Sequence, residues 1–244
     1  MNLPDPRIGD MPRLEQVVKG TKREYAKKNP DKRERLPITP ELLMQMKLVW
    51  SRGDPKNFDN TMLWAACCTC YFGFLRSGEV TVPSEAAYDS SVHLNISDIA
   101  VDSIDVPSTI KLRIKASKTD QFRKGVDIFL GRTHNHLCPV EALLAYIAKR
   151  GKEQGLLFRF EDKRLLTKDR FVSKVREALS QAGVNEKLYS GHSFRIGAAT
   201  TAGRKGLSSE KIQTLGRWES SAYLLYVRLP RDELSAVSKI ISTS

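Results

Sequence analysis

The sequence predicts a mainly α-helical domain of the α+β class, in which helices flank a small antiparallel sheet. Apolar residues recur at helical spacing near both ends of the globular part, whereas apolar and polar residues alternate in its middle. Helices, then a few strands, then helices again is the order expected of an α+β plan. The 244 residues suffice for one large domain, or for one domain and part of another.

Two helices are expected at the start of the globular part, which begins near Leu36. Thr39 suits an N-cap and Pro40 suits the first helical position, and the apolar residues of 42–50 follow at helical spacing. A second helix is expected over about 60–75, within the longest apolar run of the chain. Because it is apolar on most sides, this helix is expected at the centre of the core.

A β-hairpin is expected next. Apolar and basic residues alternate over 110–115, and alternation recurs over 126–130, which predicts two strands, the first with a basic face toward solvent. The polar link between them predicts the hairpin. Leu94, Ile96 and Ile99 favour one preceding strand.

Further helices are expected after the hairpin. Pro139 begins one that ends near Gly151, and Thr167 suits the N-cap of another that stops at Gly183. The remaining expected helices cover 193–205, which Gly206 ends, 208–216, which Ser208 or Ser209 caps, and an amphipathic stretch within 232–241.

The charge balance favours a polyanionic partner. Lys and Arg number 40 against 28 Asp and Glu, so the formal net charge is +12 and the sequence pI is about 9.6. A surplus of this size attracts nucleic acid, although charge alone does not choose between DNA, RNA and anionic lipid. Neither a signal peptide nor a membrane span is evident, so a soluble intracellular protein without a membrane partner is expected.

The cysteines are expected to be buried free thiols. Three of them crowd into one apolar stretch, and their spacing matches neither a secreted disulfide framework nor a familiar zinc site. The four are Cys67, Cys68, Cys70 and Cys138.

Chemistry-bearing residues gather in four short segments. Ser-Gly-His-Ser-Phe-Arg at 190–195 is the strongest, and Leu-Gly-Arg-Trp at 215–218 precedes Tyr223 and Tyr226. Upstream stand Gly-Phe-Leu-Arg-Ser-Gly-Glu at 73–79 and Lys118 in the hairpin link. Each residue alone is consistent with an ordinary structural role, but their joint occurrence in this order is specific.

With these motifs in this order, the chain resembles the tyrosine recombinase family, also called phage-integrase-like, over about residues 36–244. It looks most similar to eukaryotic mobile-element recombinases of the DIRS-like and Crypton-like kind. The family pattern is an arginine after a core helix, a hairpin lysine, His-x-x-Arg, a His or Trp, and a tyrosine. Matched residue by residue, the resemblance implies a catalytic set of Arg76, Lys118, His192, Arg195, Trp218 and Tyr226, with Glu79 as a supporting acidic residue.

The chemistry of these side chains agrees with the resemblance. Attack on a phosphodiester gathers negative charge on its non-bridging oxygens, which Arg76 and Arg195 can clamp with charge-assisted hydrogen bonds. His192 lies three residues before Arg195 and can donate a hydrogen bond or accept the tyrosine proton. Trp218 offers an indole N–H donor.

The resemblance makes Tyr226 the nucleophile that forms a 3′-phosphotyrosine, and Lys118 the acid that protonates the leaving 5′-oxygen. Because the covalent link retains the bond energy, no cofactor, neither ATP nor a metal, is expected. The family usually places its tyrosine nine residues after the His or Trp, whereas Tyr226 follows Trp218 by eight. Tyr223 is therefore an alternative nucleophile, and Lys115 competes with Lys118 for the hairpin position.

Other basic residues are expected to contact DNA phosphates, with a merely solvated surface as the alternative. They are Lys111, Arg113, Lys115, Arg123, Lys124, Lys168, Arg170, Lys174 and Arg204. Residues 1–35 are expected to be a linker and the remnant of a core-binding domain, and the basic run 19–35 suits either nuclear import or DNA tracking. Residues 36–244 are expected to form the catalytic domain with a C-terminal helix.

The expected function is site-specific recombination or integration of double-stranded DNA for a transposable element in the nucleus. The family's terminal helix docks into a neighbouring subunit, so a homo-oligomer, a tetramer on DNA, is implied; packing of the helix on its own domain is equally open. One alternative is a domesticated, catalytically weak DNA-binding domain. Another is a nicking-closing enzyme similar to type IB topoisomerases.

Overall fold

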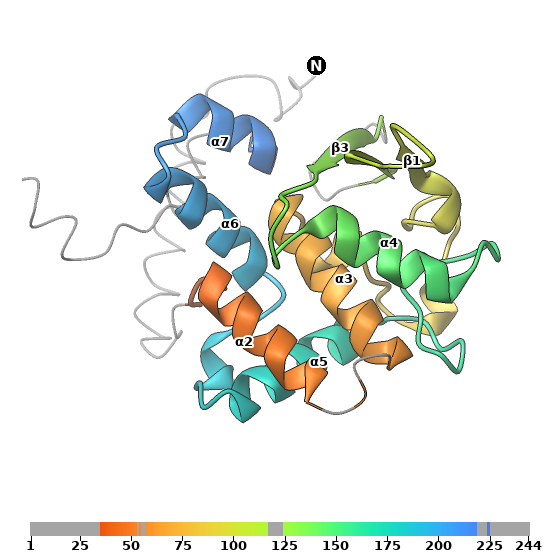
Figure 1. Cartoon of the computed structure of the whole chain (residues 1–244), viewed down its shortest axis with the longest axis horizontal. Helices are drawn as coiled ribbons and strands as arrows, with labels where there is room; N and C mark the ends of the chain where they lie inside the picture. The colour runs from red at the N-terminus through yellow and green to blue at the C-terminus, as the bar shows by residue number, and fades with distance from the viewer. Residues whose placement is uncertain (1–34, 53, 55–56, 117–123, 219–223, 225–244) are drawn as a thin grey trace, which may run out of the picture. The chain divides into compact units, whose positions relative to one another are not determined.

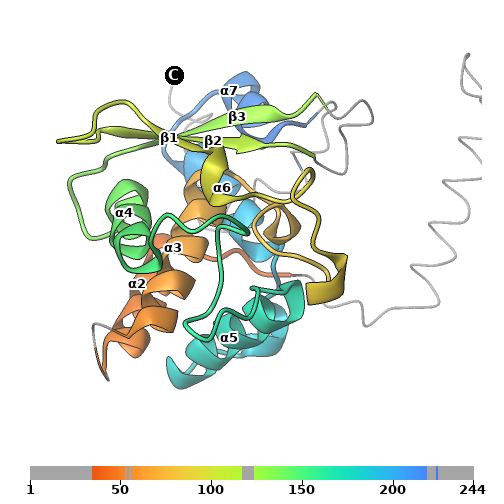
Figure 2. The ribbon, with the colours of Figure 1, turned by 90° about the vertical axis from the view of Figure 1, so that its right-hand side faces the viewer.

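The computed structural model describes residues 35–52, 54, 57–116, 124–218 and 224. Its α-helices and strands, in chain order, are α2 (Pro40–Ser51), α3 (Phe58–Phe72), β1 (Ile99–Val101), β2 (Thr109–Ile114), β3 (Val126–Gly131), α4 (Pro139–Arg150), α5 (Lys168–Gln181), α6 (Ser193–Arg204) and α7 (Ser209–Gly216). The sheet spans the top of the molecule in Figure 2, and α2, α3, α4 and α5 lie beneath it. The prediction of a mainly α, α+β fold with a small antiparallel sheet is confirmed.

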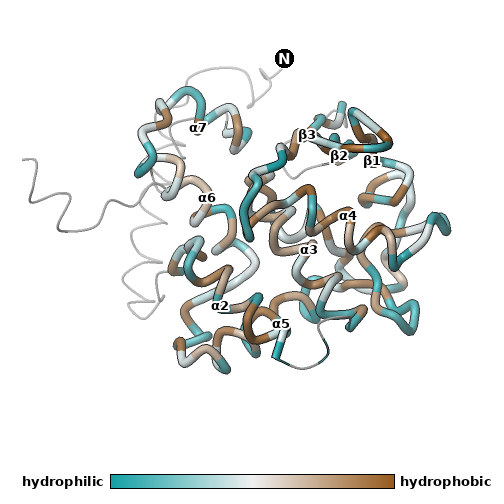
Figure 3. The backbone as a smooth tube through the Cα atoms, in the orientation of Figure 1, coloured by the Kyte–Doolittle hydropathy of each residue, from teal (hydrophilic) through white to brown (hydrophobic). Residues whose placement is uncertain are grey.

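Helix α3 is the centre of the core. All ten of its residues from Met62 to Tyr71 are buried, and it packs against α2, α4 and α6, as Figure 1 shows. Figure 3 shows the same helix among the most hydrophobic parts of the trace. It ends at Phe72, three residues before the expected end at 75, because Phe74 takes a left-handed φ of 51° that turns the chain out of the helix. This early end projects the following loop toward α6 and α7.

Local capping fixes the other helices much as the sequence predicts. Thr39 Oγ1 accepts a hydrogen bond from the Leu42 backbone N–H at 3.3 Å, and Thr167 caps α5 in the same way. Helix α4 begins at Pro139 and ends at Arg150, and Gly151, whose φ is 75°, is its C-cap. For α7 the cap is Ser208 rather than Ser209. The predicted helix 232–241 and the expected assignment of residues 1–34 lie outside the described residues.

The sheet has the order β1-β2-β3, with both neighbouring pairs antiparallel. Strands β2 and β3 pair from Thr109 with Gly131 to Ile114 with Val126, which confirms the predicted hairpin. The preceding strand is shorter than expected and begins at Ile99. Ile96 instead lies in a 3-10 turn, because Asn95 and Asp98 close a reciprocal capping box around it.

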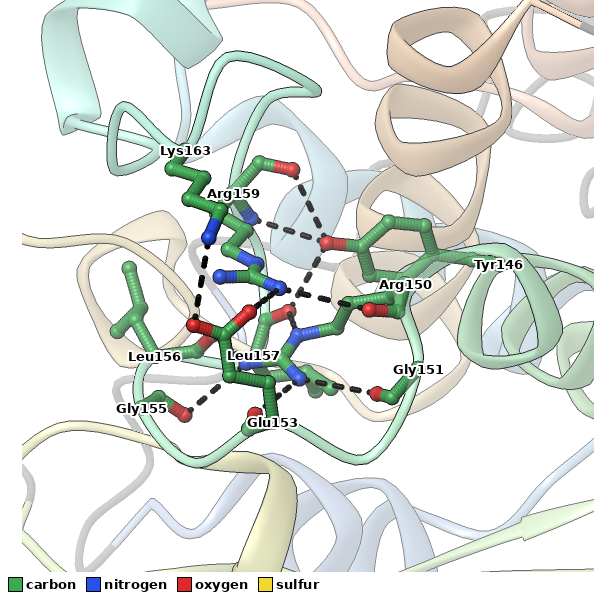
Figure 4. Close-up of polar contacts among 9 residues, drawn as sticks. All are labelled: Tyr146, Arg150, Gly151, Glu153, Gly155, Leu156, Leu157, Arg159 and Lys163. Atoms are coloured by element: carbon green, nitrogen blue, oxygen red, sulfur yellow. Dashed lines mark hydrogen bonds and ion pairs between the residues drawn. The ribbon is translucent and has the colours of Figure 1, made fainter.

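A buried arginine organises the loop after α4 (Figure 4). The Arg150 residue is 4% exposed, and its guanidinium donates from all three nitrogen atoms to backbone carbonyls. The five accepting residues are Gly151, Glu153, Gly155, Leu156 and Leu157. The Tyr146 hydroxyl also contacts this loop by donating to the Leu157 carbonyl at 3.0 Å. A single side chain therefore supplies hydrogen bonds to five backbone carbonyls of a loop that forms no helix or strand.

The four cysteines are free and buried, as expected. Burial raises the pKa of the Cys67, Cys68 and Cys70 thiols well above the ordinary value, which keeps these thiols protonated. Across the described ranges, no helix is long and apolar enough to cross a membrane. Within those ranges, His, Cys, Asp and Glu side chains form no cluster of three that could hold a metal ion.

Candidate active site

The first site residue lies where the chain leaves α3. Arg76 precedes a 3-10 turn, Ser77–Glu79, and its backbone N–H donates to Glu79 Oε2 at 2.8 Å. Its guanidinium also contacts the same carboxylate, with Arg76 Nη1 3.3 Å from Glu79 Oε1. The Arg76 side chain is 23% exposed, while that of Glu79 is 4% exposed. A buried carboxylate thus fixes an arginine that still reaches solvent.

Arg195 joins two loops that are far apart in the sequence. It lies on the first turn of α6 and is 0% exposed. Arg195 Nη1 donates to the Phe74 carbonyl at 2.9 Å, and Arg195 Nη2 donates to the Gly216 carbonyl. Its guanidinium carbon lies 4.2 Å from the centroid of the Trp218 ring, within cation–π range. The loop before Arg76 and the turn after α7 are therefore held against the start of α6.

Two glycines allow these segments to approach each other. A Cβ on Gly191 would lie 2.0 Å from Ser77 Oγ, and one on Gly216 would lie 1.5 Å from the Trp218 ring. No side chain fits at either position, since real Cβ contacts are not that short. The glycines of the 190–195 and 215–218 motifs therefore serve close packing: Gly191 brings the His192 loop to the Arg76 loop.

Arg217 also belongs to this cluster, although the sequence analysis assigned it no role. It follows α7 in a left-handed conformation with φ 54°, and its Nη2 donates to Glu79 Oε2 at 2.8 Å. Its side chain is 14% exposed. A sequence signal was present, because Arg217 precedes Tyr226 by nine residues, the family spacing that Trp218 misses by one.

The electrostatics of the cluster favour a neutral histidine. Burial, and then the positive charges of Arg195, Arg76 and Lys168, lower the pKa of His192 from 6.5 to about 4. The imidazole is therefore neutral near pH 7 and can accept a proton. Lys168, expected only as a DNA contact, lies close enough at the start of α5 to act on this histidine.

Burial also lowers the pKa of Arg217, an effect that Glu79 opposes and Arg76 reinforces. Arginine remains protonated in proteins even so. Among the described side chains, the guanidiniums of Arg76 and Arg217 thus share the single carboxylate of Glu79, and Arg195 binds the two loops that carry them. Because this arrangement has surplus positive charge, it is suited to an anion.

Four expected residues lie outside the described part of the chain: Lys118, Arg123, Tyr223 and Tyr226. The alternative hairpin lysine, Lys115, has protein partners. Its Nζ lies 2.6 Å from Asp98 Oδ2 and donates to the Ser90 carbonyl at 2.7 Å. These contacts engage the Lys115 ammonium, so Lys118 stays the expected hairpin lysine.

Several of the expected DNA-contacting residues also have acidic partners. Lys111 and Arg113 both pair with Asp127 across the hairpin, at 3.8 and 3.1 Å. Arg170 pairs with Glu85, and Lys174 pairs with Glu177 at 2.9 Å. The exposed members of the expected set are Arg113, Lys124, Lys168, Lys174 and Arg204. Lys168 alone among these acts on His192 electrostatically.

No protein-family model and no curated protein sequence matches the chain. Solved structures do match. The crystal structure of XerA recombinase has a TM-score of 0.57 and 16% identity, over 88% of this chain and 66% of XerA. XerH bound to palindromic difH, in a post-cleavage complex, has a TM-score of 0.61 and 14% identity, over 84% of this chain and 52% of XerH.

A lambda integrase dimer bound to a COC′ core site has a TM-score of 0.53 and 14% identity, over 81% of this chain and 49% of the integrase. This chain therefore spans between about half and two thirds of the length of those three proteins. At these identities the likeness concerns the fold. It shows that the described domain has the fold of tyrosine recombinase catalytic domains.

Proposed function

We propose that this chain breaks and rejoins DNA strands as the catalytic domain of a site-specific recombinase or integrase. One observation carries the proposal: Arg76 and Arg195, from separate segments, both act electrostatically on His192, and Arg76 shares the buried carboxylate of Glu79 with Arg217. Surplus positive charge beside a neutral histidine suits a phosphodiester undergoing nucleophilic attack. The fold shared with tyrosine recombinases supports the same chemistry.

The proposed step is a transesterification. The Tyr226 phenol oxygen attacks the phosphorus, a tyrosine–phosphorus bond forms, and the bond between phosphorus and the 5′-oxygen breaks. His192 takes the phenol proton, and Lys118 gives a proton to the departing 5′-oxygen. Attack by a 5′-hydroxyl on the phosphotyrosine reverses these steps and joins the strands. One phosphoester bond replaces another at each stage, so the step consumes no ATP and does not call for a metal.

The proposed substrate is double-stranded DNA. XerH and lambda integrase were solved on their DNA sites, and Flp recombinase in Holliday junction complexes. By analogy, we place a homo-tetramer of this chain on two duplexes, with residues 1–35 as a linker and the remnant of a core-binding domain. The origin that the sequence resemblance favours is a transposable element acting in the nucleus.

A second candidate function has one observation in its favour. Arg195 is fully enclosed, and its two terminal nitrogens already bind backbone carbonyls. A phosphate clamp needs donors that reach the substrate. A DNA-binding domain that keeps this fold without catalytic turnover would have no such need, and covalent trapping separates the two candidates.

The decisive experiment is covalent trapping on DNA. The full chain is incubated, without metal or ATP, with a pool of randomised duplexes that carry a nick at one fixed position. Strand cleavage beside the nick releases a short fragment that diffuses away, so any phosphotyrosine adduct accumulates and is visible on a denaturing gel. Tyr226→Phe should abolish the adduct and Tyr223→Phe should preserve it. The reverse pattern would move the nucleophile to Tyr223, and salt-sensitive binding without any adduct would support the second candidate.

A further inference from the structure

The chain enters the described domain along the loop 188–193, which carries His192. Residues 35–38, the entry strap, lie beside this loop and bind both of its ends. Leu36 and Ile38 donate their backbone N–H groups to the first and last carbonyls of the loop, each at 2.9 Å. The strap therefore fixes the two points between which the histidine is held.

Ile38 also fixes the entry strap against α6. The residue is 0% exposed, and a Cβ on Gly197, in the second turn of α6, would lie 1.8 Å from the Ile38 carbonyl oxygen. Real Cβ contacts are not that short, so only a glycine lets the two backbones approach this closely. The strap is thus held by hydrogen bonds to the loop and by backbone contact with the helix that follows the loop.

Two other segments contact the same loop at its middle. Arg176, on α5, donates from Nε and Nη2 to the Tyr189 carbonyl at 3.1 and 2.9 Å. Gly191 packs against Ser77, in the turn after Arg76. These contacts support the middle of the loop, whereas the hydrogen bonds from the entry strap support its two ends.

We propose that the entry strap positions His192: by fixing both ends of the loop 188–193, it holds the imidazole where that ring accepts the phenol proton. This inference rests on the proposed strand-transfer function. Leu36 and Ile38 are then positioning residues, which act on the histidine through the loop. Because a displacement of about 1 Å is enough to slow a proton transfer, the strap bears on the rate of strand cleavage rather than on DNA affinity.

The test removes one hydrogen bond of the entry strap in the full chain and leaves the sequence of the loop intact. Leu36→Pro deletes the N–H that binds the Leu188 carbonyl, because proline has no backbone donor. Leu36→Ala is the matched control, since it keeps this N–H and loses only side-chain packing. Gly197→Ala is an independent change that displaces the Ile38 carbonyl. Its control is Gly131→Ala, because a Cβ on Gly131 would meet nothing within 4 Å.

The rate of adduct formation is measured at saturating protein on the nicked duplex recovered from the randomised pool, and Kd is measured separately by fluorescence anisotropy. Leu36→Pro and Gly197→Ala should each lose at least about tenfold in rate, while Kd stays within about twofold of wild type. Leu36→Ala should lose less than about threefold in rate, and Gly131→Ala should match wild type. Thermal denaturation restricts the comparison to variants that are folded at the assay temperature.

A second readout does not depend on strand cleavage. Burial, and then the positive charges of Arg195, Arg76 and Lys168, hold the His192 pKa at about 4. NMR spectra of the imidazole protons, assigned with His192→Gln, report this pKa directly. Leu36→Pro should raise it toward 6.5, because a released loop returns the ring to water, whereas Leu36→Ala should leave it unchanged.

Equal losses of rate for Leu36→Pro and Leu36→Ala would overturn the inference, as would a loss that lies in Kd instead of in the rate. An unchanged His192 pKa in Leu36→Pro would overturn it as well. In these cases wild type still forms its adduct, so the proposed function stands. If wild type forms no adduct, the proposed function fails, and the pKa readout alone decides whether the entry strap holds the histidine.

Discussion

Two regions of this molecule bury an arginine, and they differ in how many of its hydrogen-bond donors find an acceptor. Arg150 donates to five backbone carbonyls in the loop after α4, which uses all of its N–H groups. Arg217 donates only to Glu79, and two of its nitrogens have no acceptor within the described segments. The contrast shows that burial alone does not reveal what an arginine does. The Arg150 guanidinium stabilises its own loop, whereas the Arg217 guanidinium keeps buried donors that nothing in the described segments accepts.

The strongest test of this contrast is Arg150→Met. It leaves a buried set of carbonyls without donors, and the free energy of unfolding should fall by about 4 kcal/mol. For a domain of this size, Tm should fall by about 10 °C, measured by thermal denaturation followed by circular dichroism. Lys163→Met is the control, since its exposed pair with Glu153 at 3.6 Å should contribute less than about 0.5 kcal/mol. If both variants lost the same small amount of unfolding free energy, the structural role of Arg150 would be contradicted.

Glu79→Gln tests the other region. It keeps the shape of the side chain but removes the one negative charge between Arg76 and Arg217. Unfolding by urea in chloride should show a loss of about 3 kcal/mol, because buried positive charges lose their counterion. About 0.1 M sulfate should then stabilise the variant more than wild type, since an anion replaces the carboxylate. If sulfate raised the free energy of unfolding equally in both proteins, an anion-binding cluster would be contradicted.

The pH dependence of stability tests the second region further, because it includes His192, which lies beside the charged cluster. Its folded pKa of about 4 is below the ordinary 6.5, so the unfolded chain binds more protons between these values. The stability that the neutral ring contributes is complete above pH 6.5 and is lost as the pH falls toward 4. Because the ring is partly exposed, we expect about 1–2 kcal/mol in total. His192→Gln should flatten Tm across this window, and an unchanged slope would contradict the shift.

The smallest expected effect discriminates best between the two regions. Arg217→Met removes an ion pair with Glu79, but it also removes two buried donors without acceptors. These contributions oppose each other, so the free energy of unfolding should change by less than about 1 kcal/mol. Urea denaturation beside Arg150→Met measures the difference directly. A loss as large as that of Arg150→Met would show that Arg217 is a structural arginine too.

Much of the fold could be predicted because its determinants are local. Thr39, Pro40 and the closing Gly151 set helix ends through groups a few residues apart, and those ends lie where they were expected. The hairpin follows from a period of two. The errors lie where contacts overrule periodicity. The end of α3 at Phe72 and the 3-10 turn at Ile96 depend on backbone geometry and side-chain capping that apolar spacing does not encode.

The candidate site was predictable in part for the same reason. Motif order pointed to Arg76, His192 and Arg195, and the structure brings these three together. Arg217 was missed because its role depends on Glu79, which is 138 residues away in the sequence. An arginine beside a conspicuous tryptophan gives no local sign of whether its donors are satisfied. Lys118, Tyr223 and Tyr226 lie outside the described residues, so their roles stay predictions.

The segment just before α2 gives the site a mechanical property. The Leu36 N–H donates to the Leu188 carbonyl, and the Ile38 N–H donates to the Ser193 carbonyl, both at 2.9 Å. A Cβ at Gly197 would lie 1.8 Å from the Ile38 carbonyl oxygen, so the two backbones touch. Tension applied to the chain ahead of residue 36 would load these hydrogen bonds first. Because Ser193 begins α6 directly after His192, the bond from Ile38 would transmit that force to the start of α6.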